Sequence, residues 1–136
     1  DTIQAAALLA TFEIFPEEIQ QRQKIAGRYD ALLSAKNKSD ISIPFVMEGS
    51  VSAYAQYTVL AKDRGGIQTR LKKAGIPSVA YYAIPLHLQP VFSSLGYRAG
   101  DFPVTELVAD ECLSLPMDPY ITEANQITVI NSLIGG

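Results

Sequence analysis

Residues 51–82 read VSAYAQYTVLAKDRGGIQTRLKKAGIPSVAYY, and this stretch decides the fold class. Side chains of Val51–Leu60 alternate between two faces, which predicts a strand. Arg64–Ala74 carries apolar residues at helical spacing, and Gly75 follows where a left-handed helix C-cap is favoured. Ser78–Tyr82 then predicts a second strand. The succession of strand, helix and strand indicates mixed α and β structure.

Two helices and a short strand are expected on the C-terminal side. Residues 83–101 are broken by prolines and glycines, and Asp101–Pro103 starts a helix. Leu113–Leu115 predicts a short strand, and Thr122 caps a last helix. We expect the inner face of the first helix to comprise Val104, Leu107, Val108 and Cys112, and that of the last to comprise Ile127, Ile130 and Ile134.

The N-terminal side begins with DTIQAAALLATFEIF, residues 1–15, which predicts a helix that is apolar on nearly all sides. Pro16 suits the first turn of a helix, and apolar residues recur at helical spacing up to about Ser34. This pattern predicts either a second helix or one long helix kinked near the proline. Residues 34–50 are expected to form a loop with a short extended piece at Ile41–Pro44.

Together these segments predict an α/β protein of the α+β type. We expect a small α/β sandwich, with a short sheet of two or three strands and helices packed on it. A long or kinked helix precedes the sandwich.

The composition excludes several classes of function. The 136 residues are 48% apolar and include 11 Lys and Arg against 14 Asp and Glu, a formal net charge of −3. This balance predicts no binding to nucleic acid or to an anionic membrane. A single cysteine excludes an intrachain disulfide, and no apolar run approaches the ~20 residues that span a bilayer. Because the chain begins at Asp1 without a signal peptide, we expect a soluble protein of the cytoplasm.

One candidate site lies at the end of the second predicted strand and in the loop that follows it. Tyr81, Tyr82, Pro85 and His87 stand there within seven positions, and loops that follow strands are where binding groups gather. These side chains could line the rim of a pocket. The alternative is that His87 is bonded only to backbone or water. Because His87 is the only histidine, a metal site with two histidines is excluded.

The other reactive residues do not form a catalytic set. A lysine that forms a Schiff base requires a desolvated pocket, whereas Lys24, Lys36, Lys38, Lys62, Lys72 and Lys73 all lie in polar or charged surroundings. Cys112 is expected to be a core residue rather than a nucleophile. Gly65–Gly66 could offer backbone amides to an anion, but it lacks the fuller glycine pattern of a nucleotide loop.

Short stretches along the whole chain then carry a resemblance. They are Asp1-Thr2-Ile3-Gln4-Ala5-Ala6, Arg22–Tyr29, Tyr54–Thr58, Ala74-Gly75-Ile76-Pro77, Tyr81-Tyr82, Pro85–Pro90, Gly96-Tyr97, Gly100–Val104 and Leu113–Met117. In their residues and in their order along the chain, these stretches resemble the DegT/DnrJ/EryC1/StrS aminotransferases. The first stretch is similar to the segment that follows an Asn-x-Arg-Leu motif in that family.

The resemblance implies the C-terminal portion of a pyridoxal-phosphate enzyme of the aspartate-aminotransferase fold. The family transfers an amino group from glutamate to the keto sugar of a nucleotide sugar. The residues of these stretches are most similar to those of members that make 3-amino sugars for surface polysaccharide. It places the cofactor lysine upstream of Asp1, in a large domain. Residues 1–34 would then be one or two connecting helices toward that domain, and residues 35–136 would form the small C-terminal α/β domain. The chain alone is then expected to be inactive and to bind no cofactor covalently. Its residues form no cluster of metal ligands, so no metal site is expected either.

The resemblance also implies roles for the candidate residues. In the family a His-Tyr-Pro or Tyr-Tyr-Pro segment lines the sugar site and often reaches the neighbouring subunit of a homodimer. Tyr81 and Tyr82 match its first two positions, and Ala83 replaces the usual proline. His87 matches the histidine of a Pro-Leu-His segment. We therefore expect Tyr81 and Tyr82 to bind substrate, with His87 as a third group.

Two alternatives stay open at this point. The chain could be a stand-alone α/β module that binds a small ligand or regulates without catalysis. It could also be an assembly or dimerisation domain, in which the apolar first helix forms the seam between two copies. A structure with that helix polar-faced and fully solvated would count against a fragment of a larger enzyme.

Overall fold

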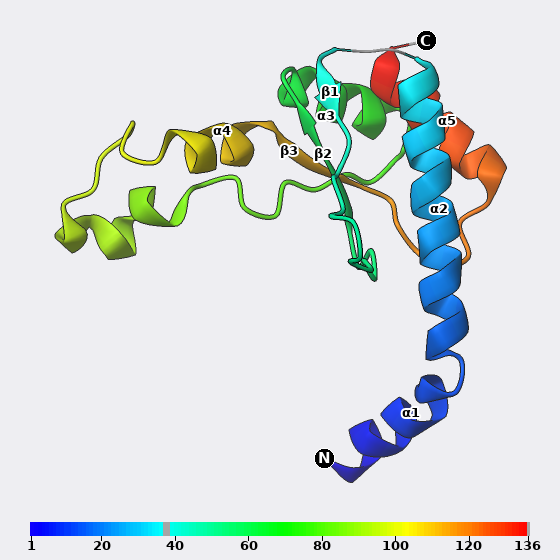
Figure 1. Ribbon diagram of the computed structural model, residues 1–136. Coiled ribbons are helices and arrows are strands. Elements are labelled where there is room, and N and C mark those ends of the chain that lie inside the picture. The colour runs from blue at the N-terminus through cyan, green and yellow to red at the C-terminus, as the bar shows by residue number, and fades with distance from the viewer. Residues whose placement is uncertain (37–38, 136) are drawn as a thin grey trace.

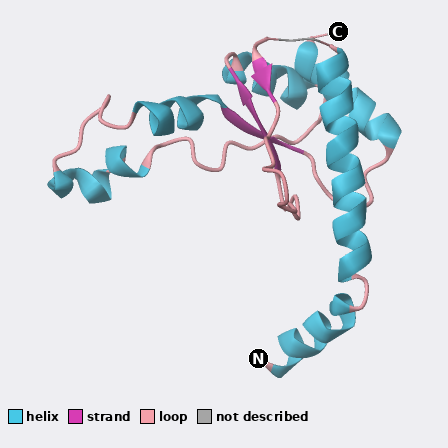
Figure 2. Ribbon diagram, in the orientation of Figure 1, coloured by secondary structure: helices cyan, strands magenta, loops and turns pink. Residues whose placement is uncertain are grey.

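The computed structural model describes residues 1–36 and 39–135. Figures 1 and 2 show a body built of helices around a small sheet, with one helix projecting at the N-terminal end and a long excursion extending to one side. The elements, in chain order, are α1 (Thr2–Phe12), α2 (Phe15–Ala35), β1 (Ile41–Ser42), β2 (Tyr57–Ala61), α3 (Arg64–Lys73), the 3-10 helices η1 (Leu86–Leu88) and η2 (Pro90–Leu95), α4 (Pro103–Glu111), β3 (Cys112–Leu115) and α5 (Glu123–Ile134).

The described strands form one antiparallel sheet in the order β1-β2-β3, which confirms the small sheet expected from the sequence. The central strand β2 pairs with β3 from Tyr57 opposite Leu115 to Leu60 opposite Cys112. Along β2, buried residues alternate with half-buried ones. That alternation is the two-residue period of a strand with one face on a core.

The strand predicted at Val51–Leu60 starts later than expected. Its ladder begins only at Tyr57, and Tyr54 has a φ of 44°, in the left-handed region. A residue in that conformation cannot continue an extended strand, so the chain before Tyr57 leaves the sheet despite its alternating pattern.

The strand predicted at Ser78–Tyr82 is reduced to a single bridge. Val79 exchanges both backbone hydrogen bonds with Ser114, at 3.2 and 2.8 Å, and no second pair follows. The chain then turns away from the sheet, so Tyr81 and Tyr82 are exposed to solvent rather than placed in a ladder.

The core lies on the face of the sheet that is covered by α2, α3 and α5. Tyr29 of α2 is at its centre: its ring lies 4.9 Å from the Tyr57 ring, and its hydroxyl donates to the Pro116 carbonyl at 2.9 Å. The largest fully buried side chains are Tyr29, Tyr57, Ile25, Leu71, Leu113, Ile130, Leu133, Gln126 and Val59.

The N-terminal segment is two helices rather than one kinked helix. Asp1 caps α1 by accepting from the Ile3 and Gln4 amides at 2.8 and 3.1 Å. A short break after Phe12 separates it from α2, which carries Pro16 in its first turn. None of the residues Thr2–Phe12 is buried. In the part of the chain that the structure describes, no helix is at once long and apolar enough to cross a membrane.

The expected inner face of α4 is wrong. Val104 is 75% exposed and Leu107 and Val108 are exposed as well, whereas the buried residue of this helix is Ala109. Cys112 is buried but is the first residue of β3. The reason is that α4 belongs to the excursion, residues 83–111, which we call the arm. Only the C-terminal end of α4 reaches the body, so the rest has no core to face.

The expected inner face of α5 is only partly correct. Thr122 caps the helix as predicted, accepting from the Asn125 amide at 3.2 Å, and Ile130 is buried. Ile127, however, is exposed, and Ile134 is half-buried. The buried residues are Gln126, Val129, Ile130 and Leu133, a single stripe of i, i+3, i+4, i+7 spacing that leaves Ile127 on its flank.

Candidate functional site

A hollow of about 490 Å³ lies where the arm joins the sheet. One wall is the chain from Tyr81 to Gln89, the other is α4, and the ends of β2 and β3 contribute the floor. The lining residues are Gln56, Thr58, Tyr81, Tyr82, Ile84, Pro85, Leu86, Gln89, Val104, Thr105, Val108, Ala109, Cys112 and Ser114. The hollow is therefore formed by segments that are far apart in the sequence.

Both predicted tyrosines line this hollow. Tyr81 is 54% exposed and Tyr82 is 79% exposed, so their rings are available to a ligand. A tyrosine ring can stack on a flat or sugar surface while its hydroxyl donates or accepts a hydrogen bond. The geometry thus brings Tyr81 and Tyr82 to one site, although it does not place them in the strand that the sequence predicted.

The floor of the hollow carries polar groups that the sequence did not single out. The hydroxyls of Thr58 and Ser114 lie 2.8 Å apart across the paired strands β2 and β3, and Gln56 precedes β2. Cys112 lies beside them, with its thiol 3.8 Å from the Ala109 carbonyl. The alternating pattern of β2 could have predicted this part of the site, because it places Thr58 on the face of the strand opposite the core.

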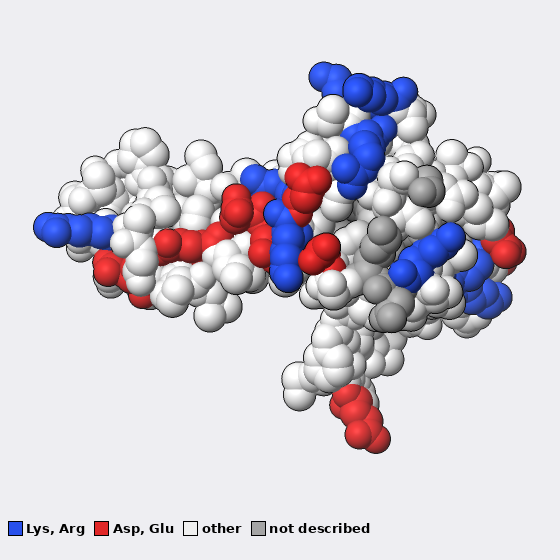
Figure 3. Space-filling view, turned by 90° about the horizontal axis from the view of Figure 1, so that it is seen from above, with Lys and Arg blue, Asp and Glu red and all other residues white. Residues whose placement is uncertain are grey.

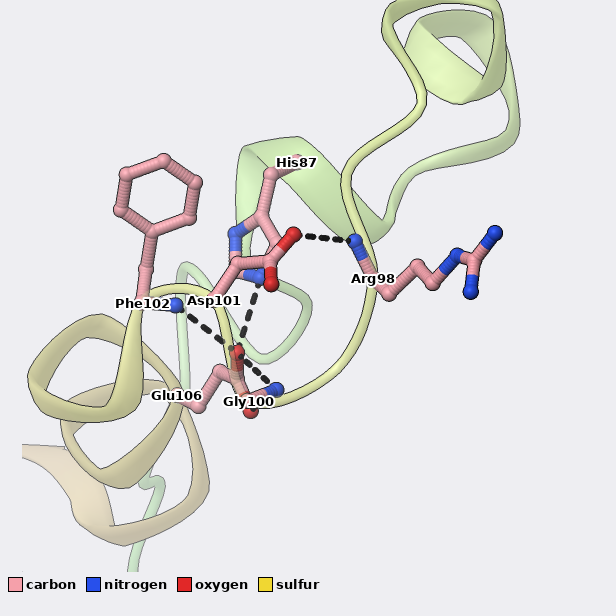
Figure 4. Close-up of polar contacts among 6 residues, drawn as sticks. All are labelled: His87, Arg98, Gly100, Asp101, Phe102 and Glu106. Atoms are coloured by element: carbon pink, nitrogen blue, oxygen red, sulfur yellow. Dashed lines mark hydrogen bonds and ion pairs between the residues drawn. The ribbon is translucent and has the colours of Figure 1, made fainter.

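The third predicted residue, His87, lies beside the hollow but does not line it. Its Nε2 is 3.0 Å from Oε1 of Glu106, its ring packs 4.8 Å from the Phe102 ring, and its side chain is only 8% exposed (Figure 4). The alternative that His87 is bonded only to backbone or water is therefore wrong, because its partner is a carboxylate.

Glu106 is the centre of this polar cluster, and the sequence analysis missed it. Its carboxylate accepts from the Gly100 amide at 2.8 and 2.9 Å and from the Phe102 amide at 3.3 Å, in addition to the contact with His87 (Figure 4). The Gly100 N–H, helped by His87 and Phe102, holds the pKa of the Glu106 carboxyl below its ordinary value. The sequence could have indicated Glu106, because it is an acidic residue in the first turn of the helix that was predicted to start at Asp101–Pro103.

The other candidates lie outside the hollow or are already engaged. The described lysines, Lys24, Lys36, Lys62, Lys72 and Lys73, are exposed, and none lines the hollow; Lys38 lies outside the described residues. The amide of Gly66 donates to Asp63 at 3.0 Å, so it is not free for an anion. Within residues 1–36 and 39–135, no group of three or more His, Cys, Asp or Glu side chains could hold a metal ion.

The charge distribution does not point to a polyanionic ligand. Figure 3 shows both signs of charge side by side where the arm joins the body. On the body, Arg70 lies 3.6 Å from Asp63 and Lys62 lies 3.5 Å from Asp40. Opposite charges in such proximity cancel each other's long-range field.

Comparison with known proteins gives consistent matches over the whole chain. The model of the DegT/DnrJ/EryC1/StrS aminotransferase family matches residues 1–134. UDP-2-acetamido-2-deoxy-3-oxo-D-glucuronate aminotransferase of Pseudomonas aeruginosa is 44% identical over 92% of this chain and 33% of its own length. A Geobacillus stearothermophilus protein described as a pleiotropic regulatory protein is 40% identical over 98% of this chain and 36% of its own.

Solved structures match equally well. A DegT DnrJ EryC1 StrS aminotransferase from Brucella abortus superposes with a TM-score of 0.88 at 40% identity, over 99% of this chain and 35% of that one. Streptomyces venezuelae DesV, in complex with a ketimine intermediate, gives a TM-score of 0.89 at 25% identity, over 96% of this chain and 34% of that one. The chain thus spans about a third of the length of the relatives it matches.

Proposed function

Because the chain belongs to the DegT/DnrJ/EryC1/StrS aminotransferase family, we propose that it is the C-terminal portion of a nucleotide-sugar aminotransferase. The complete enzyme would depend on pyridoxal phosphate and transfer an amino group from glutamate to the keto sugar of a nucleotide sugar. The observation that carries this proposal is the family match over residues 1–134 together with a chain that spans about a third of its relatives. The Pseudomonas relative, named for a 3-oxo sugar of UDP, supports the substrate class.

The described residues of this chain do not by themselves fit pyridoxal phosphate. An aminotransferase holds this cofactor through a lysine Schiff base in a desolvated pocket, and the cofactor supplies the electron sink for the chemistry. All described lysines are exposed and none reaches the hollow. The proposal therefore assigns the lysine and the other cofactor-binding groups to a large domain outside these 136 residues, toward which residues 1–34 lead.

The contribution proposed for this chain is to bind the nucleotide sugar. Tyr81 and Tyr82 would stack on the sugar or nucleotide and bond its hydroxyl or phosphate oxygens, which their exposure at the hollow permits. His87 lies beside the hollow, and its contact with Glu106 indicates a role other than binding the sugar.

We further propose a cytoplasmic homodimer. The exposed apolar side chains of α1 and the arm support an assembly that covers them.

Substituting the two tyrosines in the complete protein tests the site. Tyr81→Phe and Tyr82→Phe should each raise the KM for the nucleotide sugar about fivefold, the value of one ordinary hydrogen bond. The KM for glutamate should stay unchanged. Tyr120→Phe is the matched control, because Tyr120 is exposed on the body and bonds Glu18 instead of lining the hollow. An unchanged KM for the nucleotide sugar in both variants would refute the assignment.

The enzyme proposal itself is tested by comparing the complete protein with the 136-residue chain. With pyridoxal phosphate, glutamate and a keto nucleotide sugar, the complete protein should form 2-oxoglutarate and the chain alone should form none. Turnover by the chain alone, or borohydride-trapped cofactor on one of its lysines, would contradict the placement of the cofactor lysine. Binding of a small ligand without turnover by the complete protein would favour a regulatory module.

A further inference from the structure

The two walls of the hollow are joined to each other by one cluster of side chains. His87 lies on η1, between Leu86 and Gln89, which line the hollow from one side. Glu106 lies on α4, next to Thr105, which lines it from the other side. The 3.0 Å contact between His87 Nε2 and Glu106 Oε1 therefore connects wall to wall.

Within this chain, the other side-chain hydrogen bonds between Ile84 and Phe102 are local, such as the Arg98 amide donating to Asp101 at 2.8 Å. No residue of η1 or η2 is buried, so neither helix is fixed by a core of its own. The aromatic contacts at this point centre on Phe102, whose ring lies 4.8 Å from His87 and 5.1 Å from Tyr97. A segment with few buried apolar contacts opens easily unless specific polar contacts close it. The cluster around Glu106 is such a contact.

The carboxylate of Glu106 is suited to this task. It receives donors from three places along the arm: the Gly100 amide, the Phe102 amide and the His87 ring. A carboxylate has two accepting oxygens, whereas the amide of glutamine has one and presents an NH₂ group to any remaining donor. Changing Glu106 to glutamine should therefore lose part of the cluster without removing side-chain volume.

We propose that His87 and Glu106 are positioning residues that hold the two walls of the hollow together and so set the position of Tyr81 and Tyr82 toward a nucleotide sugar. This inference rests on the proposed function for the identity of the ligand. The connection between the walls does not depend on it. His87 acts through Glu106 and the arm rather than by touching substrate, since it lies beside the hollow and is almost fully covered.

Amide hydrogen exchange of the complete protein tests the connection directly. Glu106→Gln and His87→Leu should each speed exchange at least about fivefold in the peptides that cover residues 83–106, with no change in α2 or β2. His87→Gln should keep most of the protection, because its amide can donate near the position of Nε2. Glu111→Gln is the matched control, because it is the same substitution on the same helix. Among the described residues, the Glu111 side chain forms no hydrogen bond or ion pair. Unchanged exchange in both Glu106→Gln and His87→Leu would overturn the proposal.

Kinetics of the complete protein test the consequence for substrate. Glu106→Gln and His87→Leu should raise the KM for the nucleotide sugar about fivefold and change kcat less than about twofold, and His87→Gln should restore most of the KM. If His87→Gln is as impaired as His87→Leu while exchange in the arm stays normal, His87 contacts substrate itself and the positioning role is wrong. If the wild-type protein transfers no amino group at all, the proposed function fails, and the exchange result still decides whether the walls are joined.

Discussion

At the scale of a single residue, the end of α3 depends on one glycine. Gly75 has a φ of 72°, and the Ile76 amide after it donates to the Leu71 carbonyl at 2.9 Å, which closes the last turn of the helix. This reversal sends the chain from α3 toward Val79, its bridge to the sheet and the tyrosines beyond. The sequence predicted this glycine C-cap, because glycine adopts the left-handed region without a Cβ penalty.

Replacing Gly75 with alanine should lower the free energy of unfolding by about 1–2 kcal/mol, the cost of a left-handed alanine. Gly27→Ala is the opposite control. Gly27 is inside α2, and a Cβ there would meet nothing within 4 Å. It should raise stability by about 0.5–1 kcal/mol, since alanine is the better helix former. Urea unfolding followed by circular dichroism measures both, and equal effects of the two substitutions would contradict the explanation.

At the scale of the elements, α1 and α2 are neighbours in sequence with opposite environments. Ile25, Ala26, Tyr29 and Leu33 of α2 are buried, whereas α1 has no buried residue and exposes Ile3, Leu8, Leu9 and Phe12. Apolar side chains contribute to stability only where they leave water. In this chain α1 therefore adds little to the stability of the body and presents an uncovered apolar surface.

Changing both Leu8 and Leu9 to glutamine should leave the free energy of unfolding within about 0.5 kcal/mol of the wild type. The same change should reduce self-association of the chain at high concentration, as measured by sedimentation velocity. Leu33→Ala is the contrasting variant, because Leu33 is buried in the core and its loss should cost about 2–5 kcal/mol. A large loss of stability in the double glutamine variant would mean that α1 packs on the body in solution.

At the scale of the whole molecule, buried tyrosines connect α2 to the sheet. Burial raises the pKa of Tyr29 to about 12, and the charge of Asp118 acts in the same direction. Burial and a hydrogen bond to Asp30 also raise the pKa of Tyr57 above its ordinary value. The neutral form of both residues is thus favoured by folding.

These shifts predict loss of stability in alkali. A group whose pKa is higher in the folded state stabilises the fold below its unfolded pKa, which is ~10 for tyrosine, and loses that contribution as the pH rises through the folded value. The free energy of unfolding should therefore be constant from about pH 8 to 9.5 and fall between about pH 10 and 12. Tyr29→Phe should reduce this dependence, at a cost of about 1 kcal/mol at neutral pH for the lost bond to Pro116. Urea midpoints that do not change up to pH 11.5 would contradict the prediction.

Local patterns in the sequence predicted much of the fold. The helices at Arg64–Lys73 and Glu123–Ile134, the cap at Thr122, the small sheet and the family were all confirmed. The two helices and the cap depend on residues close together in the chain, such as Thr122 beside the helix that it caps. Where long-range contacts decide, the local pattern failed: Val104 and Val108 have helical spacing, yet the arm gives them no core.

The candidate site divides in the same way. The sequence by itself determined that Tyr81, Tyr82 and His87 stand within seven positions of one another, because position along the chain requires no knowledge of packing. Only the tertiary structure decided that the two tyrosines share a hollow with Thr58 and Ser114, and that His87 meets Glu106. The physical reason is that β2, β3 and α4 reach this place from distant parts of the chain, and the direction in which the arm leaves the sheet depends on how all of them pack.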